Sequence, residues 1–206
     1  SSDLDFLVEE FKNLKLINCY DLYDDIHDTY GLINSLPKKL HVRLAGLFYK
    51  VFNSENAVEK CRTILKKLKY DNNTINDTCN LVENINNISC NMTRKKLKLL
   101  INSVGTENIF DLLDLQKSYL SYMDEYDTEC IDILKNRVSD ILASKEPIFI
   151  KDLAITGNDL ITELNYKPGK NIGVILNFLL ENVMQTPELN NKEDLLNLSK
   201  QFYSYN

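Results

Sequence analysis

Apolar residues recur along most of the chain at the spacing of an amphipathic α-helix. In residues 57–68 they stand at i, i+1, i+4, i+7, i+8 and i+11, which places them on one face of a helix with lysines outside or beside that face. Residues 131–142 and 172–183 mark two further helices, the second with a regular i, i+3, i+4, i+7 pattern. Less regular versions predict helices over 4–17, 20–35, 38–51, 76–87, 93–103 and 107–123.

Residues that favour helix starts support this interpretation. Ser54 and Thr156 stand where N-caps belong, and a carboxylate follows Thr156 three residues later. Asn190 repeats the arrangement with an amide cap before an apolar stretch. Only residues 146–150 look extended, and they are too short to build a sheet. The sequence therefore predicts an all-α protein, a multi-helix elongated bundle.

Two stretches favour breaks between helices. The Asn-rich residues 84–92 are typical of a surface connection. Residues 144–147 are the better boundary, because Pro147 ends the preceding helix and disfavours the α conformation at Glu146. We accordingly predict three segments, residues 1–92, 93–145 and 146–206.

Composition is that of an ordinary soluble protein, with 44% apolar and 26% charged residues among 206. Its apolar stretches are short and broken by charge, and no export signal is evident, so we expect a cytoplasmic protein. No C-x-x-C pair suggests a metal or redox motif. We therefore expect reduced thiols, most of them buried. The five cysteines are Cys19, Cys61, Cys79, Cys90 and Cys130.

The net charge of −6 counts against a dedicated nucleic-acid binder. Positive charge nevertheless gathers in three runs, at 38–43, 60–69 and 94–98, away from acidic runs at 21–28 and 124–132. A basic face on an acidic body can hold a phosphate backbone. A solvated helix face remains the simpler explanation of any one run.

No catalytic constellation is evident. The two histidines, His27 and His41, form no H-x-x-x-H pair, and no Gly-rich phosphate loop occurs. The one D-x-D spacing, Asp3-Leu4-Asp5, is better explained by acids that favour a helix N-terminus. The sequence predicts neither catalytic nor metal-binding residues.

Residues 165–173 are more informative, because Pro168 and Gly169 interrupt one helix and open the next. A helix N-terminus presents free backbone N–H groups and the positive end of its dipole. With Lys167, Lys170 and Asn171 beside it, this corner suits a phosphate. A plain tight turn in a helical hairpin, with a glycine for helix packing at 173, explains the same residues equally well.

Three motifs of the C-terminal region resemble the signature of the bacterial class II tRNA nucleotidyltransferase and poly(A) polymerase family. That signature reads I-x-G-x-D-L, then P-G-x-x-I-G-x-x-L, then N-x-x-x-L-L. The chain has KDLAITGNDL at 151–160, KPGKNIGVIL at 167–176 and NNKEDLL at 190–196. It departs from the family at Asn165 and Tyr166, where a glycine usually precedes the Pro-Gly pair.

Upstream, residues 36–50 (LPKKLHVRLAGLFYK) look like the family helix that often carries an HD-type metal site. Tyr49 and Lys50 replace the His-Asp pair, and Asp28 and Ile85 stand at the other histidine positions. Such side chains do not rebuild a divalent site, so the resemblance implies a degenerate HD-like body without phosphohydrolase activity. It covers most of residues 20–200.

The resemblance implies a part of an enzyme that adds C, C and A to tRNA 3′ ends from CTP and ATP with Mg²⁺. The nucleotidyltransferase head would precede residue 1, so we expect no cofactor in this chain. Residues 1–92 would be neck and degenerate body, 93–145 body and 146–206 tail, holding the tRNA acceptor stem and elbow. The expected phosphate contacts are Lys167, Gly169, Lys170, Asn171, Arg94, Lys95, Lys96 and Lys98.

Other interpretations stay open. The negative net charge and the lost HD residues favour a non-catalytic helical scaffold derived from the family. A residual metallophosphohydrolase is the least favoured, since its ligands are absent from the sequence pattern. The choice between CCA, CC, A and poly(A) addition, and the question of a homodimer, are not decided by these residues.

Overall fold

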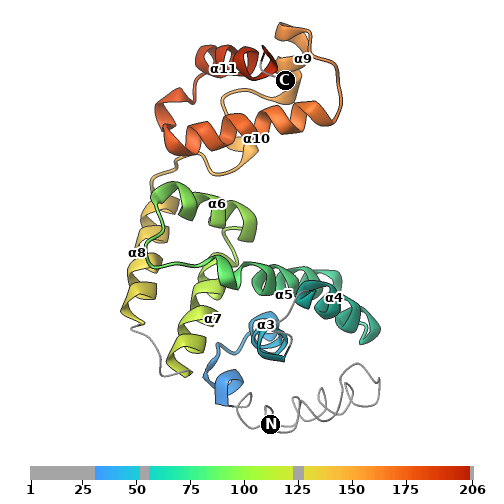
Figure 1. Cartoon of the computed structure of the whole chain (residues 1–206), viewed down its shortest axis with the longest axis vertical. Helices are drawn as coiled ribbons and strands as arrows, with labels where there is room; N and C mark the ends of the chain where they lie inside the picture. Colours follow the sequence, from blue (N-terminus) through green and yellow to red (C-terminus); the bar gives the residue numbers. More distant parts are fainter. Residues whose placement is uncertain (1–30, 52–55, 123–127, 205–206) are drawn as a thin grey trace. The chain divides into compact units, whose positions relative to one another are not determined.

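The computed structural model describes residues 31–51, 56–122 and 128–204. Residues 31–35 are helical, and no strand occurs in these three ranges, so the predicted all-α fold is confirmed (Figure 1). The elements in chain order are α3 (Leu40–Val51), α4 (Ala57–Lys67), α5 (Asn72–Asn84), η1 (Ile85–Asn87), α6 (Arg94–Val104), α7 (Ile109–Tyr122), α8 (Glu129–Ala143), η2 (Ile150–Asp152), α9 (Gly157–Leu164), α10 (Lys170–Gln185), η3 (Pro187–Leu189) and α11 (Lys192–Ser204).

The described residues group into two compact units that interleave along the sequence. The first unit takes the chain up to residue 88 together with 107–132, and the second takes 89–106 and 133–206. Thus α3, α4, α5 and α7 belong to the first unit, and α6, α9, α10 and α11 to the second. The division into 1–92, 93–145 and 146–206 follows a different criterion and stays a prediction.

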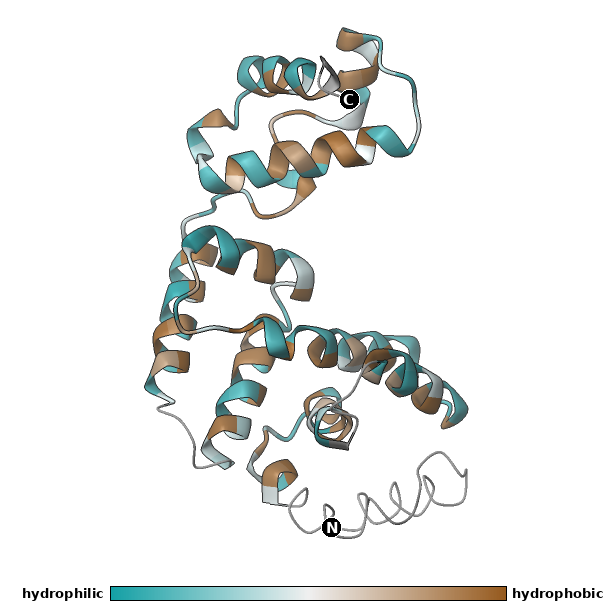
Figure 2. Cartoon of the chain, viewed as in Figure 1, coloured by the Kyte–Doolittle hydropathy of each residue, from teal (hydrophilic) through white to brown (hydrophobic). Residues whose placement is uncertain are grey.

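In the first unit, α5 packs against both α3 and α4. Hydrophobic and hydrophilic stretches alternate along these helices (Figure 2), and the apolar faces meet in the core. Phe48 of α3, Leu65 of α4 and Leu81 of α5 are all fully buried there. The first unit therefore rests on the helical periodicity that the sequence displays.

The second unit has its own core, in which α10 packs against α6, α9 and α11. Its buried apolar residues are Leu153, Ile155, Leu160, Ile175, Leu176, Leu179, Leu180, Val183, Met184 and Leu195. Six of these ten side chains lie on α10, and five of them, from 175 to 183, belong to the apolar stripe predicted over 172–183. The strongest amphipathic pattern in the sequence thus forms the centre of this unit.

Helix starts agree with the sequence at one position and differ at two others. Thr156 caps α9 as predicted, with reciprocal bonds to Asp159. The α5 helix begins at Asn72 rather than 76, because the Asp71 side chain accepts the Thr74 N–H at 3.0 Å. The predicted cap Ser54 lies outside the described residues, and Asn56 in a left-handed conformation precedes α4.

The expected cap at Asn190 is wrong by one residue. Asn191 Oδ1 accepts the Asp194 N–H at 3.0 Å, which leaves the Asn190 side chain for another role. Residues 84–92 connect two helices as predicted but do not lie wholly on the surface, because Ile85 and Met92 are buried. After α8 the chain leaves the helix at Ala143, in agreement with the break predicted at 144–147.

Two cysteines contradict the expectation of reduced thiols. Cys61 and Cys79 are buried free thiols, as predicted. Cys90 and Cys130, however, are disulfide-bonded, although disulfides are uncommon in reducing compartments. Cys19 lies outside the described residues. None of the described helices is both long and apolar enough to cross a bilayer.

Candidate nucleic-acid interface

The predicted corner forms between α9 and α10. Asn165 ends α9 in a left-handed conformation, and Gly169 is the N-cap of α10 with φ of 150°. This φ favours glycine, because a side chain there would be strained. All four expected contact residues of the corner, Lys167, Gly169, Lys170 and Asn171, are exposed.

The start of α10 is open to an anion. Gly169 has no side chain with which to cap the helix, and the backbone N–H of Ile172 is bonded to Gly169 O at 3.1 Å. The first N–H groups of α10, at Lys170 and Asn171, have no acceptor within the helix. An anion placed there would meet these donors together with the lysine charges.

The two glycines flanking this corner act differently. A Cβ on Gly173 would meet no atom within 4 Å, so helix packing does not explain that glycine. A Cβ on Gly157 would lie 2.8 Å from Ile172 Cγ2, so Gly157 is the one that permits close packing of α9 on α10. The packing role expected at 173 therefore belongs to position 157.

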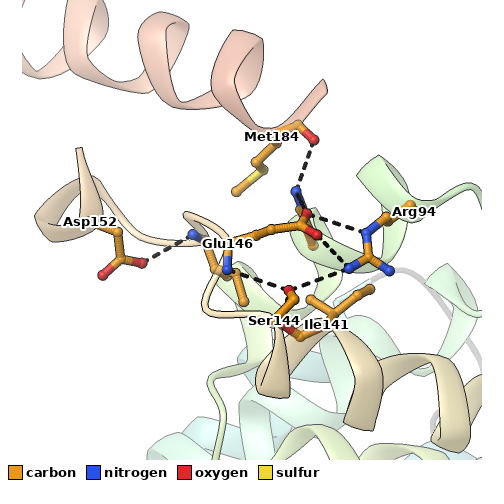
Figure 3. Close-up of polar contacts among 8 residues, drawn as sticks. Arg94, Ile141, Ser144, Glu146, Asp152 and Met184 are labelled. Carbon is orange, nitrogen blue, oxygen red and sulfur yellow. Dashed lines mark hydrogen bonds and ion pairs between the residues drawn. The ribbon is translucent and has the colours of Figure 1, made fainter. Parts of the chain in front are cut away.

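The second expected cluster, on α6, divides into exposed and buried members. Arg94 and Lys96 are exposed and Lys95 is half-buried. Lys98 is 1% exposed; its ammonium pairs with Glu146 and donates to Met184 O at 3.1 Å (Figure 3). Lys98 therefore does not present its charge to a phosphate, and we correct that part of the expected contact set.

Arg94 also has a partner within the protein. Its guanidinium donates to Glu146 Oε1 at 2.6 Å and to Ser144 Oγ at 3.3 Å. Hydrogen bonds from Arg94 and then Lys98 lower the pKa of Glu146 from 4.5 to about 2, and the same pairing raises the pKa of Arg94. One carboxylate is thus shared by two cations, which leaves this cluster less positive than its sequence suggests.

The two clusters lie near opposite ends of α10. Lys98 reaches Met184, near the last residue of α10, whereas Lys170 is the first residue of that helix. At 1.5 Å per residue, the intervening fourteen residues span roughly 21 Å. The two clusters would consequently meet different phosphates of an extended ligand.

Contacts that the sequence does not reveal join α9 and the residues before it to the start of α11. Asn190 Nδ2 donates to Asp152 O at 2.9 Å, and Asn190 Oδ1 accepts from Ala154 N at 2.8 Å. Lys192 of α11 lies 2.5 Å from Glu163 of α9. The Asn190 contacts join backbone segments 36 and 38 residues away, so no local pattern could have indicated them.

Of the positions at which the resemblance implies a lost HD-type site, Tyr49, Lys50 and Ile85 lie within the described residues. Tyr49 donates to Asn86 Oδ1 at 2.6 Å, and burial together with Tyr119 raises the pKa of Tyr49. Ile85 is buried, while Asp28 and His27 lie outside the described residues. No group of three His, Cys, Asp or Glu side chains suited to a metal occurs in the part of the chain that the structure describes.

One polar cluster in the first unit was not predicted from the sequence. Asp111 of α7 is 6% exposed at its side chain and lies 2.7 Å from Lys39 Nζ and 2.9 Å from His41 Nε2. The His-Asp contact joins residues 70 positions apart. It links α7 to the start of α3, and we assign it a structural role.

Comparison with known proteins gives one family. A model described as "tRNA nucleotidyltransferase domain 2 putative" matches residues 48–198. That range covers about three-quarters of the chain and includes α10, the corner at its start and the α6 cluster. Neither the curated proteins nor the solved structures give a match.

Proposed function

The chain belongs to the tRNA nucleotidyltransferase domain 2 family, and from that membership we propose that it holds tRNA during 3′-end synthesis. The observation that carries the proposal is the family match over residues 48–198. In this proposal the described helices grip the acceptor stem and elbow of a tRNA that receives CCA, or only CC or A. The catalytic Mg²⁺, CTP and ATP belong to a separate nucleotidyltransferase head.

The corner before α10 supports this function chemically. Lys167 and Lys170 are exposed, and the first N–H groups of α10 point the same way as the positive end of its dipole. Such a site binds phosphate oxygens without reading bases. That suits A-form RNA, whose deep major groove does not admit side chains, so recognition relies on shape and phosphate contacts.

At the other end of α10, Lys95 and Lys96 offer a second phosphate contact. Lys98 is buried and therefore does not contact a phosphate. Arg94 is paired with Glu146, which reduces its attraction for a phosphate. A ligand that touches both ends of α10 must extend about 21 Å, which a folded RNA can do and a mononucleotide cannot.

The test is a mobility shift with a tRNA that lacks its 3′ CCA, at about 50 and about 200 mM salt. We expect binding that weakens steeply with salt, and a Lys167→Ala/Lys170→Ala variant with lower affinity and a shallower salt dependence. Each lost phosphate contact lowers the slope of log K against log salt by roughly 0.7 to 0.9.

The matched control removes the same charge from another exposed helix, as Lys66→Ala/Lys67→Ala on α4. Equal loss of affinity in both double variants would argue for non-specific attraction and against the corner. Absence of wild-type binding at the lower salt would contradict a tRNA-holding role for this chain.

A non-catalytic protein-interaction scaffold is the second candidate. The net charge of −6 and the pairing of Arg94 and Lys98 with Glu146 favour it, because both reduce the attraction for RNA. The same binding experiment separates the two functions, since a scaffold has no reason to retain salt-sensitive affinity for tRNA.

A further inference from the structure

Two cysteines lie side by side in the core of the first unit, and the proposed RNA contacts do not involve them. Cys61 on α4 is 0% exposed and Cys79 on α5 is 1% exposed, with their Sγ atoms 3.7 Å apart. Both are free thiols. Because α4 and α5 pack against each other, helix packing rather than a loop sets this separation.

We infer that Cys61 and Cys79 form a redox modification site, a dithiol that a peroxide converts into a disulfide joining α4 to α5. An S–S bond is about 2 Å long, so the two sulfurs must approach by less than 2 Å. Changes of side-chain rotamer move a sulfur by such distances without displacing a helix.

The surroundings distinguish the two thiols. The hydrogen bond with Cys61, aided by the charges of Arg62 and Lys66, lowers the pKa of Cys79 to about 7 against the opposing effects of burial and Glu83. The same hydrogen bond, with burial, raises the pKa of Cys61. Buried cysteines in apolar surroundings are usually inert, because their thiolate is disfavoured. Both sulfurs are buried, and the lower pKa of Cys79 makes it the first to attack a peroxide in this scheme, with Cys61 as the resolving thiol.

The chemistry needs only hydrogen peroxide as co-reactant. The Cys79 thiolate attacks one peroxide oxygen, so that an S–O bond forms, the O–O bond breaks and hydroxide leaves. The Cys61 sulfur then attacks the sulfenic sulfur; the S–S bond forms, the S–O bond breaks, and the Cys61 proton leaves with that oxygen as water. Two thiols are oxidised to one disulfide while one peroxide is reduced to two waters.

The resulting bond would close a loop between residues 18 positions apart. A cross-link of this kind stabilises a fold mainly by restricting the unfolded chain. Residue 58, in the first turn of α4, lies beside the same sulfur, with its carbonyl oxygen 3.8 Å from Cys79 Sγ. The disulfide would thus join the middle of α4 to the middle of α5.

The experiment exposes the native full chain to excess hydrogen peroxide, blocks remaining thiols by alkylation and maps the disulfides by mass spectrometry. Cleavage after Lys and Glu separates Cys61 (residues 61–66) from Cys79 (residues 70–83), and Glu83 separates Cys79 from Cys90. We expect a cross-linked pair of these two peptides, reversed by a thiol reductant, together with a higher unfolding temperature of the oxidised protein.

Single variants test the assigned order. In Cys61→Ala a sulfenic acid should persist on Cys79 and react with a 1,3-dicarbonyl probe, whereas Cys61 should stay reduced in Cys79→Ala; circular dichroism verifies that both variants fold. Recovery of both cysteines as separate alkylated peptides, while an added model thiol is oxidised, would overturn the inference. So would a cross-link that forms only in denaturant.

Discussion

Replacing Glu146 by Gln should destabilise the second unit substantially, because it leaves a buried cation without its counter-charge. Lys98 is 1% exposed and would keep only neutral acceptors after the change, Met184 O and the amide oxygen of the new side chain. The pKa of Glu146 falls from 4.5 to about 2 on folding, and one pKa unit corresponds to about 1.4 kcal/mol, which sets an upper limit of about 3.5 kcal/mol. The Glu146 side chain is 23% exposed, so we expect about 2 kcal/mol.

The assay is urea unfolding at neutral pH followed by far-ultraviolet circular dichroism, since the chain contains no tryptophan. With a slope of roughly 2 kcal/mol per molar urea, the midpoint of the second unit should fall by about 1 M. Lys98→Met is the matched control. It removes the buried charge and leaves Glu146 paired with Arg94, so it should cost less than the Glu146 change.

The double variant Glu146→Gln/Lys98→Met should be more stable than Glu146→Gln alone, because no unpaired charge remains buried. The pKa of Glu146 is lowered in the folded protein, so its contribution is full above pH about 4.5 and is lost as the pH falls towards 2. Additive effects in the double variant, or a difference from wild type that does not shrink with acid, would refute this reasoning.

Four further substitutions address other parts of the structure. Asn190→Ala should lower the free energy of unfolding by about 1 kcal/mol, measured by urea denaturation, because it removes two hydrogen bonds to the backbone of residues 152 and 154. Gly157→Ala should destabilise by about 1 to 3 kcal/mol, since its Cβ would collide with Ile172, whereas Gly173→Ala should stabilise by up to about 1 kcal/mol in the same thermal unfolding series. Asp111→Asn should cost about 2 kcal/mol through loss of its contacts to Lys39 and His41, and an unchanged melting temperature would contradict the role given to this cluster.

The helices could be predicted because burial on one side of a helix leaves a periodic trace in the sequence. The α10 stripe from Ile175 to Val183 is such a trace, and the Thr156 capping box marks the start of α9 locally. The predicted cap of α11 was one residue away from the observed one, because two neighbouring residues offer the same capping side chain. Asn190 and Asn191 are chemically alike, and only the backbone at 152–154 decides which of them is left to cap α11.

The candidate site was less predictable, because the environment of a charge depends on residues distant in sequence. The corner from Lys167 to Asn171 is local, so its exposed cations and glycine N-cap followed from the pattern. Lys98 flanks the apolar stripe of α6, and nothing nearby in the sequence shows that α10 covers that flank. The pairing of Cys79 with Cys61, across two helices, was equally hidden.

The interleaving of the two units has a consequence for the newly made chain on the ribosome. Lys98 is synthesised 86 residues before the carbonyl group of Met184 that completes its burial. At roughly 5 to 20 residues per second, α6 waits about 4 to 17 seconds with its apolar face uncovered. Residues 107–132, which the first unit needs, emerge during that interval, so the first unit can close while α6 still lacks its partner. The order of translation therefore favours completion of the first unit before the second. During that interval α6 is the segment that a chaperone would bind.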